Sequence, residues 1–210
     1  SEEYEFIDRL DKPVALWTNL LVENGTHRNA LNKVKNPIDE HIIDLPEFDN
    51  KGSWIQKYSK RLAELQIQSR ELNKIRKTIA LIQTEGAYAK YNLEIYNQVI
   101  NLVDYNFKLM KSLKAFDNAR LPKDEIKLIE NMKSLVEEFD IVREQFEEVY
   151  GKTRILNKPD NYILDQDHHR HPANQSINFD WQFKAELMLL TKIKNHIKTH
   201  VSWEEGTKAI

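Results

Sequence analysis

Residues 54–83 decide the fold, and they read WIQKYSKRLAELQIQSRELNKIRKTIALIQ. The apolar residues of this stretch recur at intervals of mostly three and four, with Lys and Arg between them: Ile55, Tyr58, Leu62, Leu65, Leu72, Ile75, Ile79 and Ile82. This spacing predicts an amphipathic helix. Ser53 is a candidate N-cap and the pattern pauses at Gly86, so we expect a helix over 54–84 that is about 46 Å long. A helix of that length indicates a helical bundle.

The flanking sequence continues the same periodicity. Four further helices are predicted on these grounds: 13–23, 87–116, 123–150 and 179–200. Pro122 suits the start of a helix, and Gly151 is expected in the C′ position that follows one. We therefore predict an all-α fold, a single helical domain over 1–210 built as a bundle of about five long antiparallel helices.

Two long segments have no helical period, 24–53 and 151–175. Connections beyond about 12 to 15 residues are uncommon in compact domains and often have a function. We expect both segments to be ordered loops, packed onto the helices by apolar and aromatic side chains: Leu45, Trp54, Ile155, Leu156, Tyr162 and Ile163.

Composition excludes several classes of protein. The 210 residues include 5 Gly and 6 Pro, which are few for an all-β or Rossmann-type chain because turns and phosphate loops use glycine. The absence of Cys excludes disulfides, thiolate zinc sites and cysteine nucleophiles. The formal net charge of −2 argues against nucleic acid as a partner. No apolar run approaches the roughly 18 to 20 residues that span a bilayer, so we expect no membrane span.

Charge is divided between the predicted helices. Residues 54–85 carry more basic than acidic side chains, and residues 123–150 carry more acidic than basic ones. Opposite signs favour pairing of the two helices, although exposed ion pairs contribute only about 0.2 to 1 kcal/mol each. Two solvated helix faces are the simpler interpretation.

The densest chemical cluster is Asp-Gln-Asp-His-His-Arg-His at 165–171. Imidazole and carboxylate groups are ligands for Zn²⁺, Fe²⁺ or Mn²⁺, and this makes five residues candidate metal ligands: Asp165, Asp167, His168, His169 and His171. Successive side chains of an extended loop alternate sides, which separates neighbouring histidines. The His-Glu-x-x-His spacing of a zinc protease is absent. We therefore favour a structural or partner-facing role and expect no metal and no cofactor.

A second polar cluster lies in the first long loop, where His27 and Arg28 are adjacent. A guanidinium binds carboxylate or phosphate through two parallel hydrogen bonds, so these residues are candidates for contact with an anion or a partner. Anchoring of the loop is the competing interpretation.

No catalytic constellation is apparent. The adjacent carboxylates Asp124-Glu125 and Glu147-Glu148 fall on predicted helices and point about 100° apart, so neither pair converges on one substrate atom. A Gly-rich phosphate loop, a Gly-x-Ser-x-Gly elbow and a Cys/His dyad are all missing. We expect this chain not to be an enzyme.

Three sequence runs carry a family resemblance: 26–33 (THRNALNK), 42–46 (IIDLP) before Trp54, and 151–154 (GKTR) followed by 168–181. They resemble the helical region that follows the catalytic barrel in Bacteroidetes-type family 20 glycoside hydrolases, the β-N-acetylhexosaminidases. The resemblance covers nearly the whole chain. That family's catalytic Asp-Glu pair closes a barrel strand, whereas Asp39-Glu40 lies in a loop flanked by prolines and Asp124-Glu125 opens a helix, so neither pair takes that role.

The resemblance implies a non-catalytic helical accessory or interaction domain of a larger, glycan-processing protein. Its partner would be the adjacent catalytic domain of the same polypeptide, and its location would be extracytoplasmic, periplasmic or at the cell surface. Two alternatives stay open: a metal-binding protein or metalloenzyme that uses the cluster at 165–171, and a stand-alone helical module that binds a protein or peptide.

Metal content distinguishes the metal-binding alternative from the accessory domain and the stand-alone module. Elemental analysis of protein purified without a His-tag should find less than one metal ion per chain, and a chelator should leave the melting temperature unchanged. Stoichiometric zinc, iron or manganese that disappears in His169→Ala would favour the metalloprotein.

Overall fold

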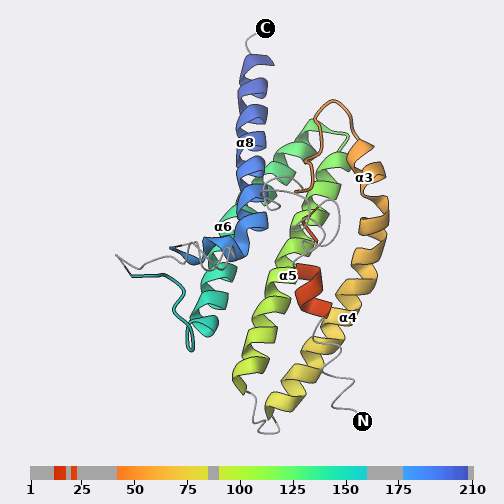
Figure 1. The fold of residues 1–210 in the computed structure, drawn as a ribbon. Helices are drawn as coiled ribbons and strands as arrows, with labels where there is room; N and C mark the ends of the chain where they lie inside the picture. The colour runs from red at the N-terminus through yellow and green to blue at the C-terminus, as the bar shows by residue number, and fades with distance from the viewer. Residues whose placement is uncertain (1–11, 18–19, 23–41, 85–89, 160–176, 208–210) are drawn as a thin grey trace, which may run out of the picture.

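The computed structural model describes residues 12–17, 20–22, 42–84, 90–159 and 177–207. Within these ranges the fold is all-α, as predicted. The named helices are α3 (Ser53–Lys57), α4 (Ser59–Thr84), α5 (Lys90–Asn118), α6 (Pro122–Tyr150), the 3₁₀-helix η1 (Phe179–Phe183) and α8 (Lys184–Thr207). Consecutive long helices run antiparallel (Figure 1).

The helix α5 is the centre of the bundle. It lies between α4 and α6 and packs against both, while α8 packs on α6 (Figure 1). Its buried residues cover a wide part of the helix surface: Leu93, Val99, Ile100, Leu102, Val103, Tyr105, Asn106, Phe107, Leu109, Met110, Leu113, Phe116 and Asp117. A helix that is buried on several sides is typical of the core of a bundle.

The N-terminal helix is shorter than predicted. Residues 12–17 are helical, Leu20 lies in a turn, and Val22 forms an isolated antiparallel β-bridge with Ile42. The prediction of a helix over 13–23 is therefore wrong at its C-terminal end. Apolar spacing alone did not distinguish a helix from a short helix followed by an extended segment.

A side chain of α4 explains why the helix does not continue. The Arg61 guanidinium donates hydrogen bonds to the carbonyl oxygens of Leu20 at 2.7 Å and Val22 at 2.8 Å. These contacts direct both carbonyl groups toward α4. The N-terminal segment is thereby held on the bundle by a charge-assisted pair of hydrogen bonds.

The stretch that was predicted as one helix over 54–84 is two helices, α3 and α4, separated at Tyr58. Tyr58 is buried, its ring contacts the Trp54 ring at 4.9 Å, and its hydroxyl accepts a hydrogen bond from the Asp44 backbone nitrogen at 2.9 Å. Contacts with a distant segment thus hold Tyr58 at the break. The C-terminal prediction of 179–200 also needs correction, because its first turn is the 3₁₀-helix η1 and α8 extends to Thr207.

The predicted cap of the second helix is wrong as well. Gly52 is the N-cap of α3, with φ of 93°, and Ser53 is the first helical residue, whose hydroxyl donates to the Asn50 carbonyl oxygen at 2.8 Å. Capping comes instead from α5: the Ile55 backbone nitrogen donates to the Asp117 carboxylate at 2.8 Å. A negative charge at a helix N-terminus is favourable because the backbone N–H groups there lack partners.

The glycine after α6 is the C-cap of that helix and not the predicted C′ residue. Gly151 has φ of −69° and ψ of −15°, which is a right-handed conformation open to any residue. A Cβ at this position would lie 2.9 Å from the backbone oxygen of Glu147, so close contact with the backbone disfavours a side chain.

The described parts of the two long loops pack partly as predicted. Trp54 is buried, and Leu45 and Leu156 pack against the core. Ile155 was expected to pack as well, but it is 82% exposed. Tyr162 and Ile163 lie outside the described residues.

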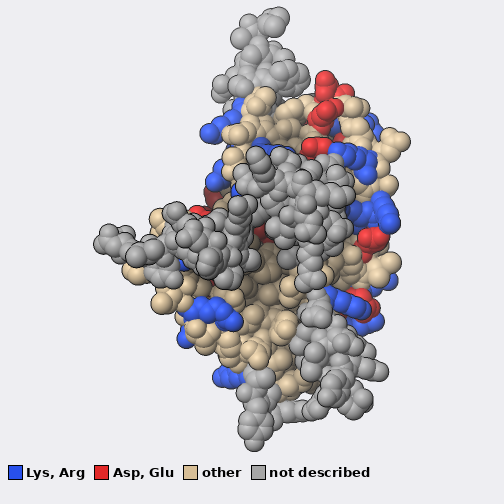
Figure 2. Space-filling model, in the orientation of Figure 1, with Lys and Arg blue, Asp and Glu red and all other residues tan. Residues whose placement is uncertain are grey.

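The surface carries mixed charge, and Figure 2 shows basic and acidic side chains interspersed with uncharged ones. The basic helix α4 does not pair with the acidic helix α6, since α5 lies between them; Arg76 of α4 contacts Asp104 of α5 at 2.5 Å. Within the described ranges, every helix is too short or too polar to cross a membrane.

The contact of Asp117 with α3 leads to a stability prediction. Asp117→Ala should lower the free energy of unfolding by about 1–2 kcal/mol because α3 loses the acceptor at its N-terminus. Asp117→Asn, which keeps an acceptor oxygen, should lose less. Urea denaturation measures both, with exposed Asp49→Ala as the control. An equal loss in Asp117→Ala and Asp49→Ala would contradict the capping role.

Candidate interaction groove

The candidate site residues from sequence analysis fall in two segments. His27 and Arg28 lie within 23–41, and the five candidate metal ligands lie within 160–176; both segments are outside the described residues. Among the described residues, no group of three or more His, Asp or Glu side chains is arranged to hold a metal ion.

The described ends of the segment around 160–176 lie side by side. The Lys158 backbone nitrogen donates to the Ile177 carbonyl oxygen at 2.7 Å, and the Phe179 backbone nitrogen donates to the Asn157 side chain at 3.4 Å. Arg143 of α6 joins this junction to the bundle, because its guanidinium pairs with both Glu147 and Asp180. The chain therefore leaves and re-enters the bundle at one place, the C-terminal end of α6.

Stacked aromatic rings support the same junction. Tyr150 lies 5.2 Å from Phe146 and 5.5 Å from Phe179, measured between ring centroids. The Arg154 guanidinium lies over the Tyr150 ring at 4.2 Å. These contacts fix the position of η1 and, through it, the start of α8.

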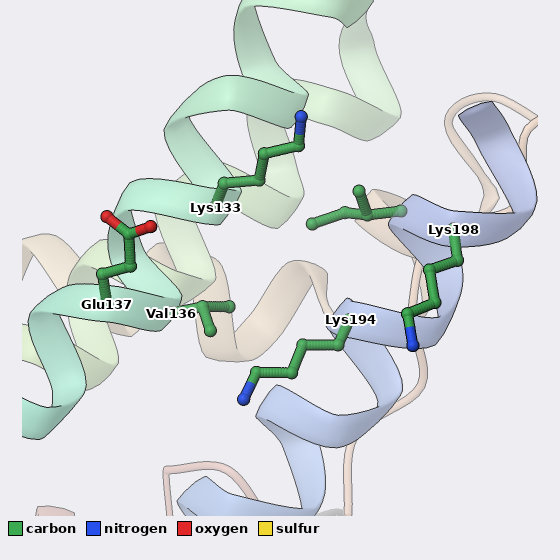
Figure 3. Close-up of a pocket in the computed structure, with 6 residues that line it drawn as sticks. Lys133, Val136, Glu137, Lys194 and Lys198 are labelled. Carbon is green, nitrogen blue, oxygen red and sulfur yellow. The ribbon is translucent and has the colours of Figure 1, made fainter.

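A surface groove lies between α6 and α8. Its volume is about 280 Å³, and it is lined by Lys133, Val136, Glu137, Lys194, Ile197 and Lys198. Figure 3 shows Val136 facing the space between the helices, with the lysines of α8 on one side and Lys133 and Glu137 of α6 on the other. We call this feature the α6–α8 groove.

The lining residues follow one pattern on each helix. Lys133 and Glu137 are one helical turn apart on α6, and Lys194 and Lys198 are one turn apart on α8. Val136 and Ile197 supply the apolar floor. The groove therefore presents apolar surface inside and charged groups at its rim, which is the arrangement of a protein interaction site.

The charges of the two walls differ. On α6, Lys133 pairs with Glu130 at 2.6 Å, and Glu137 adds a further negative charge. On α8, Lys194 and Lys198 have no ion-pair partner among the residues that the structure describes. The α8 wall is thus positive, whereas the α6 wall is mixed.

A buried polar cluster lies deeper in the same part of the bundle. Glu186 of α8 is 1% exposed and accepts hydrogen bonds from the Trp17 indole nitrogen at 2.9 Å and the Asn106 amide nitrogen at 3.1 Å. Trp17 also contacts the Phe146 ring at 5.3 Å and the Phe183 ring at 6.1 Å. This cluster joins the N-terminal segment, α5 and α8.

Burial raises the pKa of Glu186, and the hydrogen bonds from Asn106, its own backbone and Trp17 oppose that shift only in part. A carboxylic acid that is sealed from solvent has no access to a substrate. We therefore interpret the cluster as a structural link, whereas the α6–α8 groove is open to a partner.

Comparison with protein-family models, with curated proteins and with solved structures found no match to this chain.

Sequence reasoning did not single out the groove. The sequence gives Lys133, Lys194 and Lys198 ordinary solvated positions on amphipathic helices, and the excess of basic side chains lies on residues 54–85. The signal that was present is the spacing of Lys194 and Lys198 beside an apolar position, on a helix whose last turns continue past the predicted end. This spacing indicates a groove only once α8 is known to pack against α6, and the sequence alone did not show that packing.

The raised pKa of Glu186 leads to a pH prediction. Because the neutral acid is favoured in the folded state, the stability that it contributes is complete below the unfolded pKa of 4.5 and is lost as pH rises through the folded pKa. Over that window one proton changes the free energy of unfolding by at most about 1.4 kcal/mol per pH unit.

Glu186→Gln has no proton to lose, so its stability relative to the wild-type chain should increase as pH rises above 4.5. Urea denaturation of both proteins at several pH values measures the difference. A difference that does not change with pH would contradict the raised pKa.

Proposed function

We propose that this chain is a non-catalytic helical accessory domain of a larger, glycan-processing protein, and that it contacts the adjacent catalytic domain through the α6–α8 groove. The observation that carries the proposal is the apolar floor of Val136 and Ile197 between charged walls. The glycan-processing part rests on the resemblance of the chain to the helical region of family 20 glycoside hydrolases. An extracytoplasmic location is part of the same proposal.

The open position of the groove favours contact with a protein over a small molecule. Small-molecule sites bury most of the ligand. The groove has a volume of about 280 Å³ and lies open at the surface between two helices. It has room for one or two apolar anchor side chains, which is how helix and peptide partners bind grooves.

The N-terminal attachment suits an accessory domain. Trp17 inserts between aromatic rings and donates to Glu186, and Arg61 binds the backbone of Leu20 and Val22. These contacts attach the described N-terminal segment to α4 and α8.

The stand-alone binding module is the second candidate, and the same groove favours it. The two functions differ in the source of the partner. A catalytic domain encoded in the same reading frame supports the accessory domain, whereas a reading frame without one supports the independent module.

An activity assay tests the proposal that this chain is not catalytic. The purified chain should not hydrolyse an aryl N-acetyl-β-glucosaminide, because glycosidases need two carboxyl groups about 5 to 9.5 Å apart in a concave site. Full-length parent protein is the positive control. Turnover by the isolated chain that is lost on replacement of one Asp or Glu would contradict the proposal.

A binding assay tests the proposal that this chain is an accessory domain that contacts the catalytic domain. The separately produced catalytic domain of the parent should bind this chain, and calorimetry should find one site per chain. Absence of binding, or a reading frame that encodes no catalytic domain, would contradict the proposal.

A further inference from the structure

We propose that the α6–α8 groove binds an acidic amphipathic helix, which places its apolar side on Val136 and Ile197 and its carboxylates against Lys194 and Lys198. The inference rests on the proposed interaction function and specifies the chemistry of the partner. It is carried by the lining of the groove, by the charges of its two walls and by the spacing of the α8 lysines.

The spacing of the lysines matches a helical partner. Lys194 and Lys198 are four residues apart on α8, which corresponds to a rise of about 6 Å along the helix axis. Two carboxylates at positions i and i+4 of a partner helix have the same separation and lie on one face. A helix that runs alongside α8 therefore brings both carboxylates to both lysines at once.

The arrangement of α6 and α8 also favours a helix. The two helices are antiparallel (Figure 1), since Phe146 near the end of α6 contacts Phe183 just before α8, while Val136 of α6 and Ile197 of α8 both line the groove. A third helix in the groove between them would form a three-helix arrangement with an apolar seam, which is a recurrent recognition mode for amphipathic helices.

The charges of the two walls determine which side of the partner helix faces α8. Glu137 on α6 repels a carboxylate, and the charge of Lys133 is offset by Glu130. Lys194 and Lys198 make the α8 wall the favourable side for negative charge. The acidic side of the partner helix is thus directed to α8, and its opposite side, toward α6, is expected to be neutral or basic.

The other occupants are a basic helix and a small free anion. A basic helix would place like charges against the two lysines of α8, which is unfavourable. A small anion would contact the lysines but leave the apolar floor of Val136 and Ile197 exposed to water. Both occupants are distinguishable outcomes of the test below.

The test uses a fluorescent helical peptide as the probe. The peptide carries Glu at positions i and i+4, Leu on the adjacent face and Ala elsewhere, and a matched peptide carries Lys in place of each Glu. Fluorescence anisotropy with the whole chain should show saturable binding of the acidic peptide. Binding should weaken as NaCl is raised from about 0.05 M to about 0.5 M, because salt screens the pairs with Lys194 and Lys198.

Two variants test the groove itself. Lys194→Glu combined with Lys198→Glu should weaken binding of the acidic peptide about tenfold or more, because attraction becomes repulsion. Val136→Asp should also weaken binding because it places a charge in the apolar floor. The matched control is Lys192→Glu, an exposed lysine of α8 outside the groove lining, which should change the dissociation constant less than about twofold. Circular dichroism checks that each variant keeps its helices.

Three results would overturn the inference: no binding of the acidic peptide, equal binding of the basic peptide, or an equal loss in Lys192→Glu and the double variant. Complete displacement by millimolar inorganic phosphate, with no effect of Val136→Asp, would identify a small-anion site instead. If the parent's catalytic domain binds the chain but neither groove variant weakens that complex, the inference fails together with the groove as the contact surface, whereas the accessory-domain role stands. If the catalytic domain does not bind at all, the proposed function fails independently of the peptide result.

Discussion

The fold follows from the burial of α5. Its buried apolar residues cover a wide part of the helix surface, so one neighbouring helix is not enough to shield them from water. The helices α4 and α6 pack on it from either side. Two buried polar side chains of α5 form hydrogen bonds to other helices: the Tyr105 hydroxyl donates to the Leu135 carbonyl oxygen of α6 at 2.7 Å, and Asn106 donates to Glu186 of α8. These bonds help to fix the positions of α6 and α8 along α5.

The same constraint leaves α8 at the periphery. It packs on α6, and its buried Glu186 reaches past α6 to α5 and to Trp17. The first half of α8 is therefore fixed by the core, whereas Lys194 and Lys198 line a groove at the surface. The second half of α8 also contacts the core, because the His196 ring stacks on the Phe48 ring at 4.2 Å and lies 5.5 Å from the Phe116 ring.

The sequence predicted the existence and type of the long helices because the apolar residues of each recur at intervals of mostly three and four. It did not predict features that depend on distant contacts: the end of the first helix at the Arg61 guanidinium, the break at Tyr58 against Asp44, and the cap of α3 by Asp117. The α6–α8 groove was also not predicted, because it depends on a distant contact. Lysines on a helix surface line a groove only where another helix packs beside them, and the sequence alone does not show that α8 packs on α6.

Lysine reactivity in the full-length parent tests whether the α6–α8 groove is the interaction surface. Brief acetylation, followed by peptide mass spectrometry, compares each lysine in the parent with the same lysine in this isolated chain. We expect Lys194 and Lys198 to react more slowly in the parent, while Lys192 should react equally in both. Unchanged reactivity of Lys194 and Lys198, with protection elsewhere on the bundle, would contradict the assignment of the α6–α8 groove as the interaction surface.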